Sequence, residues 1–114
     1  MIMSKVHQKK RSYENGGILK DVFLLTKSPD HVRTRLCWRL ITQSENVVLY
    51  LTGDGVYNLL CPSVQKLPPK KILVCKEDQK ARGVQIEGIV ITLIDFYDRM
   101  IEDIMDEKNK VYVF

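Results

Sequence analysis

The feature that most constrains the fold is a short apolar run, Ile72–Cys75, that passes directly into a charged segment ending at Gly83. The run has the length and composition of a buried strand, and residues 76–82 are helix formers or polar residues. Gly83 can adopt the left-handed backbone that ends many helices. The sequence therefore predicts a strand followed at once by a helix, with Cys75 at the carboxyl end of the strand.

The rest of the chain continues this alternation without an internal repeat. Further strand-like runs occupy residues 22–26, 47–51, 89–94 and 111–114, and helical patterns follow residues 28–30, cover 56–60 and follow Asp95. Strands separated by helical segments favour parallel pairing through right-handed crossovers. We therefore predict an α/β fold, a three-layer sandwich with a mainly parallel sheet of about five strands. In such sheets, functional sites lie at the carboxyl ends of the strands.

The two longest predicted helices each carry an apolar face. In the first, which runs from the capping cluster at residues 28–30 to about residue 43, the apolar residues are Val32, Leu36, Cys37, Leu40 and Ile41. In the last, they are Phe96, Met100, Ile101, Ile104 and Met105. Asp95 is predicted to cap this last helix, with Asp98 at its third position. Both apolar faces are predicted to pack on the sheet.

Length and charge indicate one neutral domain with a basic extension. The chain has 114 residues, 45% of them hydrophobic, which suits a single domain with its own core. The net charge of +4 comes from residues 1–20, with five basic residues and one acidic residue, whereas the remainder holds thirteen of each. We expect residues 21–114 to form the domain and residues 1–20 to be a flexible extension. No direct specific binding to nucleic acid is expected, because short basic segments bind polyanions non-specifically.

Several other classes of protein are not indicated. No apolar run is long enough to span a bilayer, and signal-peptide features are lacking, so we expect a cytoplasmic protein without a membrane association. Cys37, Cys61 and Cys75 show no C-x-x-C spacing, which favours reduced thiols and no metal site. The turn at residues 53–55 has two glycines but lacks the complete fingerprint of a dinucleotide or phosphate loop, so no cofactor is expected.

Cys75 is the first candidate for a reactive thiol. A partly exposed thiol at the start of a helix would lie near unpaired amide hydrogens, which favour the nucleophilic thiolate. Lys76, Lys80 and Arg82 would add positive potential, although such charges are also typical of a solvated helix surface. Cys37 is the second candidate. A structural role stays open for both, because cysteine is among the most often buried residues.

Four further segments occur together and in order along the domain. They are Leu25-Thr26-Lys27-Ser28-Pro29, Asp54-Gly55-Val56-Tyr57, Glu77-Asp78 with Ala81-Arg82-Gly83, and Ile94-Asp95-Phe96-Tyr97-Asp98. With this order and spacing, residues 22–114 resemble the DsrE/DsrF/DsrH superfamily of sulfur-relay proteins, which includes the TusB, TusC and TusD subunits of the tRNA-thiolation relay. The segments are most similar to the DsrH/TusB branch.

This resemblance implies a flavodoxin-like sandwich that carries persulfide sulfur and forms homo-oligomers, or hetero-oligomers with DsrE- and DsrF-like subunits. DsrE and TusD proteins carry sulfur on a cysteine eight residues before the glycine of an Arg-Gly pair, and Cys75 has this spacing from Gly83. DsrH proteins instead tend to have a cysteine in the first helix, near Cys37, and TusB proteins can lack a reactive thiol. The branch features and the thiol spacing therefore point to different roles.

Two functions remain open. In the first, the chain is a sulfur carrier or sulfurtransferase, in which the Cys75 thiolate takes sulfur from a donor protein and yields it to an acceptor protein, in tRNA thiolation or sulfur oxidation. In the second, it is a non-catalytic TusB-like structural subunit of a hetero-oligomeric relay complex. Nucleotide or flavin binding is a third interpretation that would rest on analogy of fold alone.

Overall fold

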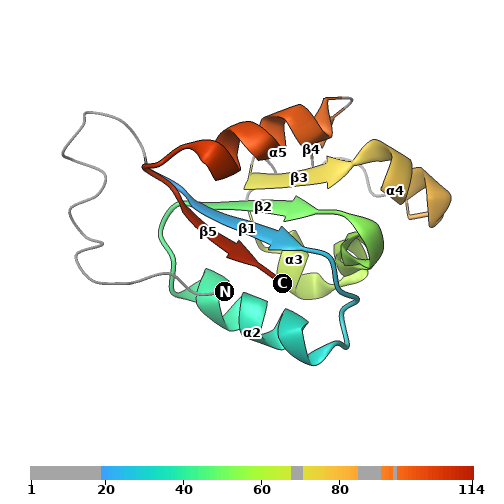
Figure 1. The fold of residues 1–114 in the computed structure, drawn as a ribbon. Helices are drawn as coiled ribbons and strands as arrows, with labels where there is room; N and C mark the ends of the chain where they lie inside the picture. The colour runs from blue at the N-terminus through green and yellow to red at the C-terminus, as the bar shows by residue number, and fades with distance from the viewer. Residues whose placement is uncertain (1–18, 68–70, 85–90, 94) are drawn as a thin grey trace.

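The computed structural model describes residues 19–67, 71–84, 91–93 and 95–114, and Figure 1 shows them as a sheet between helical layers. Of the predicted extension at residues 1–20, only Leu19 and Lys20 are among the described residues. Likewise, positions 89, 90 and 94 of the last predicted internal strand lie outside them. No helix in the described part of the chain is long and apolar enough to cross a membrane.

In the described part of the chain, five parallel strands form one sheet in the order β4-β3-β2-β1-β5. The strands are β1 (Asp21–Leu25), β2 (Val47–Leu51), β3 (Ile72–Cys75), β4 (Ile91–Leu93) and β5 (Lys110–Val113). The helical elements are α2 (Val32–Thr42), the 3-10 helix η2 (Gly53–Leu60), α3 (Pro62–Gln65), α4 (Lys76–Ala81) and α5 (Phe96–Met105). The predicted α/β sandwich with a parallel sheet is confirmed, and its architecture is flavodoxin-like.

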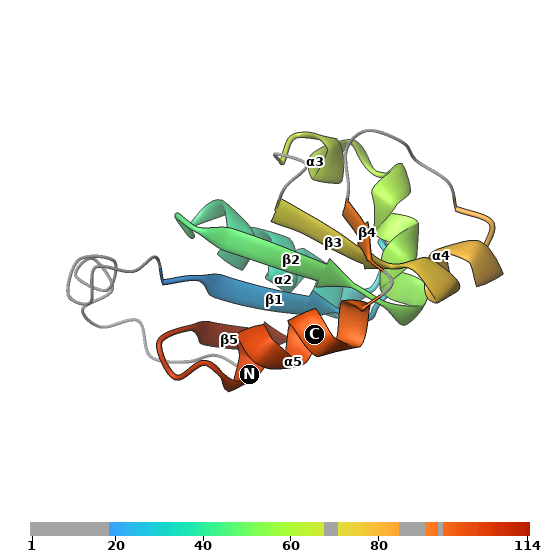
Figure 2. The same ribbon diagram turned by 90° about the horizontal axis from the view of Figure 1, so that it is seen from above.

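The strand order explains why helices lie on both faces of the sheet. From β1 the chain adds β2, β3 and β4 in one direction, and it then returns to place β5 on the other side of β1. Because parallel crossovers are right-handed, this reversal moves the connecting helix to the opposite face. Figure 1 and Figure 2 show that α5 covers one face, whereas α2 and α3 lie on the other.

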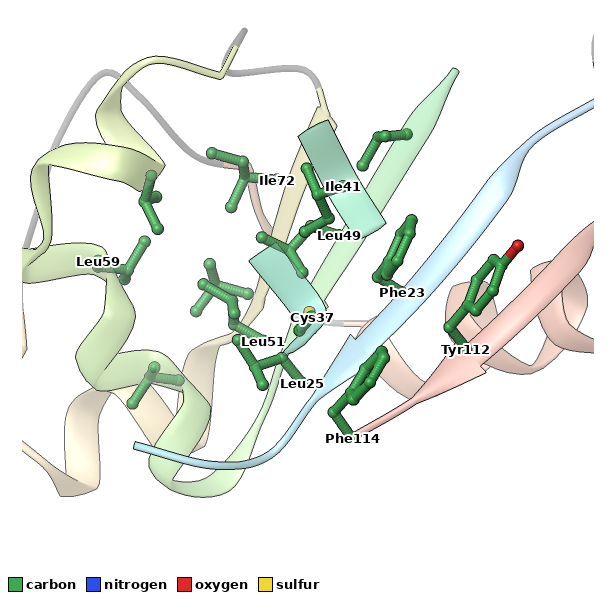
Figure 3. Close-up of a cluster of buried hydrophobic side chains, with 14 of the residues drawn as sticks. Phe23, Leu25, Cys37, Ile41, Leu49, Leu51, Leu59, Ile72, Tyr112 and Phe114 are labelled. Carbon is green, nitrogen blue, oxygen red and sulfur yellow. The ribbon is translucent and has the colours of Figure 1, made fainter. Parts of the chain in front are cut away.

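Each face of the sheet has its own core. The α2-side core, shown in Figure 3, includes Phe23, Leu25, Cys37, Ile41, Leu49, Leu51, Leu59, Ile72, Tyr112 and Phe114. The α5-side core comprises Val22, Tyr50, Leu73, Cys75 and Phe96. Successive residues of a strand point to opposite faces, so Val74 belongs to the first core and Cys75 to the second.

The prediction for the apolar face of α2 is wrong in part. The buried residues are Thr34, Cys37 and Ile41, whereas Val32 and Leu36 are 68% and 39% exposed. Thr34 can be buried because its hydroxyl donates to the carbonyl of Ser28 at 2.6 Å, which satisfies the polar group. The N-cap residue of α2 is His31, one position after the predicted capping cluster at residues 28–30. The Nδ1 atom of His31 accepts a hydrogen bond from the Arg33 amide at 3.0 Å.

α5 packs on the sheet through a narrower row than predicted. Phe96 is buried, and Met100 and Ile104 are partly buried against the α5-side core. This spacing of four residues keeps the three side chains on one side of the helix. Asp95 is the N-cap residue, as predicted, but its side chain makes no capping hydrogen bond, and Asp98 occupies the third position.

A second row of α5 faces outward and is defined here as the α5 exposed row. It consists of Tyr97, Ile101 and Met105, which are 49%, 53% and 73% exposed. The predicted packing of Ile101 and Met105 on the sheet is therefore wrong. These residues follow the packing row by one position, and this offset turns them away from the sheet.

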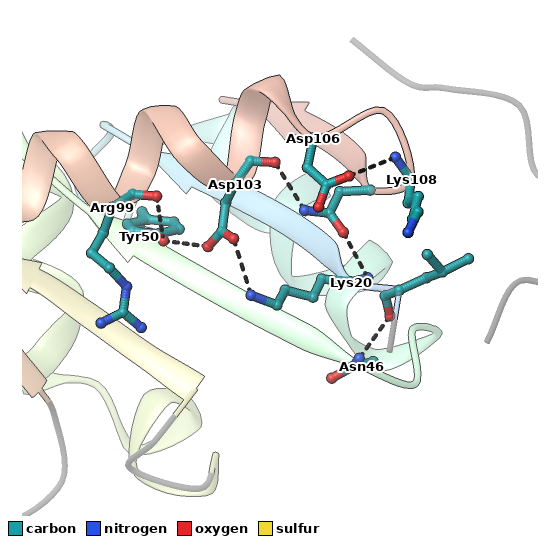
Figure 4. A network of polar contacts seen from close by, with 9 residues as sticks. Lys20, Asn46, Tyr50, Arg99, Asp103, Asp106 and Lys108 are labelled. Atoms are coloured by element: carbon teal, nitrogen blue, oxygen red, sulfur yellow. Dashed lines mark hydrogen bonds and ion pairs between the residues drawn. The ribbon is translucent and has the colours of Figure 1, made fainter. Parts of the chain in front are cut away.

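A polar network, shown in Figure 4, fixes the amino edge of the sheet. The Lys20 ammonium binds the Asp103 carboxylate at 3.0 Å, and the Lys20 amide donates to Asn109 Oδ1 at 3.1 Å. Asp103 also accepts a hydrogen bond from the hydroxyl of the buried Tyr50. Burial and the Asp103 carboxylate raise the pKa of Tyr50, so its hydroxyl stays protonated and donates to the carboxylate.

Candidate functional site

The carboxyl edge of the sheet places the loop after β2 next to the junction of β3 and α4. Cys75 is the last residue of β3 and the N-cap residue of α4. Leu51, the last residue of β2, pairs with Val74, so Thr52 leaves β2 at the level of Cys75. The predicted position of Cys75, at a strand end followed at once by a helix, is confirmed. Gly83, with a φ of +67°, follows the end of α4 as predicted.

Asp78 in α4 holds the loop after β2. Its Oδ2 atom accepts hydrogen bonds from the Thr52 hydroxyl at 2.6 Å and from the Gly53 amide at 2.7 Å. Gly53 has a φ of +56°, which glycine adopts without the steric cost that a β-carbon would bring. The carboxylate thus links two chain segments that each follow a strand, and it fixes their relative positions beside Cys75.

The Asp78 carboxylate is ionised at neutral pH. Burial raises the pKa of Asp78, but the Gly53 amide, the Thr52 hydroxyl, the Cys75 thiol and the Arg82 charge outweigh burial, and the pKa lies below its ordinary value. An ionised carboxylate only accepts hydrogen bonds, so the hydrogen of the Thr52 hydroxyl is committed to Asp78. Thr52 Oγ1 can therefore serve a further neighbour only as an acceptor.

The three basic residues near the thiol have different surroundings. Arg82 Nε donates to Asp54 Oδ1 at 3.1 Å, and a terminal nitrogen of Arg82 lies 3.8 Å from Asp78 Oδ1. The Arg82 guanidinium therefore interacts with two carboxylates, and its connection with the thiol is indirect, through Asp78. Lys76 and Lys80 are exposed on α4. Their support of the thiol stays a prediction.

Tyr97, in the first turn of α5, belongs to the site and was not assigned from the sequence. Its hydroxyl oxygen lies 4.0 Å from the Cys75 sulfur and 3.4 Å from Thr52 Oγ1. The Thr52 contact lowers the pKa of Tyr97, but burial, the Cys75 thiol and the Asp78 charge outweigh it and raise the pKa. The available sequence signal was the position of Tyr97, two residues after the N-cap of a helix that follows a strand.

The sulfur of Cys75 has an apolar environment with two polar neighbours. Cys75 is 4% exposed and belongs to the α5-side core, so the expectation of a partly exposed thiol is wrong. α4 has six residues, and the carboxylates of Glu77 and Asp78 lie in its first turn. These negative charges already interact with the positive amino end of the helix dipole. The helix terminus therefore favours a charged sulfur less than predicted. The polar groups at the sulfur are instead the Tyr97 hydroxyl and the Asp78 carboxylate.

The other two cysteines lie away from this edge. Cys37 is fully buried among aliphatic and aromatic side chains of the α2-side core, as Figure 3 shows, and burial raises the pKa of its thiol to about 12. It is thus on the opposite face of the sheet from Cys75. Cys61 is half-buried and is the N-cap residue of α3. Of the three, Cys75 alone has the position predicted for a carrier thiol.

The turn at residues 53–55 is explained by packing. A β-carbon added at Gly55 would lie 2.0 Å from the carbonyl oxygen of Leu25. Only glycine lets the start of η2 approach the end of β1 this closely. The second glycine of the turn therefore has a structural role that requires no bound phosphate.

The point at which the strand order reverses lies between β1 and β5, where doubly wound sheets commonly bind ligands. Here the Thr26 hydroxyl donates to the carbonyl of Phe114 at 2.8 Å, and Arg33 donates to the carbonyl of Val113 at 3.2 Å. The Arg33 guanidinium also lies 5.6 Å from the centre of the Phe114 ring. The chain's own side chains thus occupy this edge, which does not favour the flavin or nucleotide interpretation.

The described residues contain no group of three side chains suited to a metal ion.

Comparison with known proteins connects this site with a family. The family model described as DsrH like protein matches residues 27–110, a range that includes Thr52, Cys75, Asp78 and Tyr97. Comparisons with curated proteins and with solved structures found no match. The matched range covers more than half of the chain and the whole of the site. The chain therefore belongs to the DsrH-like family, in the DsrH/TusB-like branch of the sulfur-relay superfamily.

Proposed function

We propose that this chain is the persulfide-carrying subunit of a sulfur relay, with Cys75 as the carrier thiol. Its family connects the chain with a sulfur relay. The observation that carries the proposal is the grouping of Thr52, Asp78 and Tyr97 around one thiol at the carboxyl edge of a parallel sheet. Cys37, the second candidate, is packed instead among the apolar side chains of the α2-side core.

The proposed reaction is an exchange between a thiolate and a persulfide. After the Cys75 proton has left to solvent, the thiolate attacks the outer sulfur of a donor persulfide, R–S–SH. A new S–S bond forms at Cys75, the S–S bond of the donor breaks, and the leaving thiolate R–S⁻ takes up the proton that the outer sulfur carried, which gives R–SH. Cys75 then holds an anionic persulfide. The same exchange with an acceptor thiolate returns Cys75 to its thiolate, and no external oxidant or reductant is needed.

The depth of the sulfur sets a condition for this transfer. Cys75 is 4% exposed, so the donor and acceptor thiols reach it only after a local movement at the carboxyl edge. In the relay, we expect docking of the partner protein to promote this movement, whereas a small persulfide reaches the sulfur during spontaneous local opening.

Burial of Cys75 also favours a second candidate function. A buried thiol in a core is chemically inert in most proteins. In this alternative the chain is a non-catalytic TusB-like subunit, and Cys75 is a packing residue of the α5-side core. The two functions differ in a single property, which is whether Cys75 takes up sulfur.

Incubation with a low-molecular-weight persulfide, followed by intact-mass measurement, separates the two functions. The wild-type chain should gain one sulfur, Cys75→Ser should gain none, and Cys37→Ala should behave as the wild type. Alanine is chosen at position 37 because a serine hydroxyl would be buried among apolar groups. A wild-type chain that gains no sulfur supports the structural subunit, and loading that survives Cys75→Ser assigns the carrier role to another cysteine.

The relay function implies association with other subunits. The α5 exposed row carries three apolar side chains on one side of a helix and begins at Tyr97, within the site. We propose that this row packs against a second copy of this chain. Light scattering should show a mass well above 13.3 kDa, and Ile101→Lys should reduce it. Leu60→Lys is the matched control, since Leu60 is 59% exposed on η2; a large mass that survives Ile101→Lys contradicts this assignment.

The setting of the relay follows from the thiol chemistry. The described cysteines are unpaired, and a persulfide carrier needs reduced thiols, which the cytoplasm maintains. We therefore propose a cytoplasmic protein whose domain begins near residue 21, with donor and acceptor proteins as its partners. tRNA thiolation and sulfur oxidation would both use the same transfer step at Cys75.

A further inference from the structure

The sulfur of Cys75 needs a hydrogen-bond donor whenever it carries a charge. It belongs to the α5-side core, in which Val22, Leu73 and Phe96 are apolar. An anion in such surroundings is costly unless polar groups stabilise it. The Asp78 carboxylate can accept a hydrogen bond from the neutral thiol, but it repels a thiolate or a persulfide anion. The stabilising donor must therefore come from another residue.

We infer that Tyr97 positions and stabilises the charged sulfur of Cys75, by directing its hydroxyl hydrogen to that sulfur during transfer. The inference rests on the proposed carrier function and adds a positioning residue to it. The geometric basis is the place of the Tyr97 hydroxyl, 4.0 Å from the Cys75 sulfur and 3.4 Å from Thr52 Oγ1.

The hydrogen bonds of the site determine which group donates. The Thr52 hydroxyl gives its single hydrogen to Asp78, at 2.6 Å. Between Thr52 and Tyr97 the hydrogen must then come from Tyr97, because Thr52 Oγ1 can only accept. Asp78 and Thr52 thereby fix Tyr97 as a donor toward the Thr52 oxygen, while the Tyr97 oxygen accepts from the neutral Cys75 thiol at 4.0 Å. Once the sulfur is charged, it becomes a second acceptor within reach of the Tyr97 hydroxyl.

The charge of the sulfur decides between these two acceptors. While Cys75 is a neutral thiol, the Tyr97 hydrogen is best placed on the Thr52 oxygen, because a thiol is a weak acceptor. When the sulfur becomes a thiolate or a persulfide anion, a charge-assisted hydrogen bond is stronger, and the hydrogen turns to the sulfur. The raised pKa of Tyr97 keeps this hydrogen in place at neutral pH. The hydroxyl serves both the attacking thiolate and the persulfide product, since both are anions.

Tyr97→Phe tests this role, because it removes the hydroxyl and keeps the ring. With a low-molecular-weight persulfide as donor, we expect the maximal rate of sulfur loading to fall about tenfold, the scale of one hydrogen bond to a charged group. The donor concentration at half-maximal rate should stay the same. Alkylation of Cys75 by iodoacetamide at neutral pH should also slow about tenfold. Tyr57→Phe is the matched control, because Tyr57 packs against the α2-side core.

The outcomes distinguish this inference from the carrier function. If Tyr97→Phe loads sulfur and is alkylated at wild-type rates, Tyr97 has no positioning role, and the carrier function stands. A rise in the half-maximal donor concentration with an unchanged maximal rate overturns the inference in favour of a docking role. If the wild type takes up no sulfur, the carrier function fails, and the alkylation rates alone decide whether Tyr97 stabilises the thiolate.

Discussion

The Cys37 thiol, the second candidate for the carrier, should be almost inert in the folded protein. Burial raises the pKa of this thiol from 9.0 to about 12. Three pKa units reduce the thiolate fraction at neutral pH about a thousandfold, and the thiolate is the form that reacts. Cys37 is also fully buried, so a reagent reaches it only when the structure opens. Global unfolding is populated at about 10⁻⁴ or less for a stability of about 5 kcal/mol or more, so it offers no faster route.

Alkylation with iodoacetamide at neutral pH measures this difference. The reaction is stopped at timed intervals, the chain is digested, and the labelled fraction of each cysteine peptide is determined by mass spectrometry. The same chain unfolded in urea supplies the rate of each cysteine without its fold, and the half-buried Cys61 is an internal comparison. Folded Cys37 should react at least a thousandfold more slowly than unfolded Cys37. A rate within about tenfold of the unfolded rate would refute both the burial argument and the exclusion of Cys37 as a carrier.

Three further predictions follow from the packing and the charges. Gly55→Ala should destabilise the protein by about 3 kcal/mol in urea unfolding, because its β-carbon would meet the Leu25 carbonyl. Gly83→Ala, with open space around the added β-carbon, should cost only about 1 kcal/mol, and equal effects of the two substitutions would contradict the packing role of Gly55. The stability of Tyr50→Phe should fall less at alkaline pH than that of the wild type. A tyrosine pKa that is raised in the folded chain stabilises the fold below about pH 10, and this stability is lost as pH rises further. Asp78→Asn should cost about 2 kcal/mol of stability at pH 7 and should lessen the loss of stability below about pH 4. A carboxyl pKa that is lower in the folded than in the unfolded chain stabilises the fold above the pKa of the unfolded chain, and this stability is lost as pH falls. For Tyr50→Phe as for Asp78→Asn, a pH profile of stability parallel to that of the wild type rules out the assigned role of the residue.

The sequence predicted the parallel sheet because a helical segment separates each strand-length run from the next. Such a segment connects parallel strands, whereas the two strands of a hairpin are joined by a short turn. It predicted the place of Cys75 for the same reason, since an apolar run that meets a helix without a linker ends at the carboxyl edge. It did not predict which side of each helix faces the sheet. Thr34 is buried because a nearby carbonyl accepts its hydroxyl, and Ile101 is exposed because the sheet accommodates only one row of α5.

The polar part of the site depends on contacts between segments far apart in the chain. Asp78 meets Thr52 across 26 residues, and Tyr97 meets Cys75 across 22. Neither pair has a spacing that periodicity or a local motif reveals, because the pairs form only after β2, β3 and α5 have been placed side by side. The same placement turned Arg82 toward Asp54 and buried Cys75, two outcomes that the local charge pattern did not predict.

Peptide-level localisation of the relayed sulfur determines whether Cys75 carries it. The wild-type chain is incubated with a low-molecular-weight persulfide, capped with iodoacetamide and digested, and each cysteine peptide is sequenced by tandem mass spectrometry. We expect one additional sulfur on the peptide that contains Cys75, and none on those that contain Cys37 or Cys61. Sulfur on Cys37 or Cys61, or on no cysteine, would rule out Cys75 as the carrier.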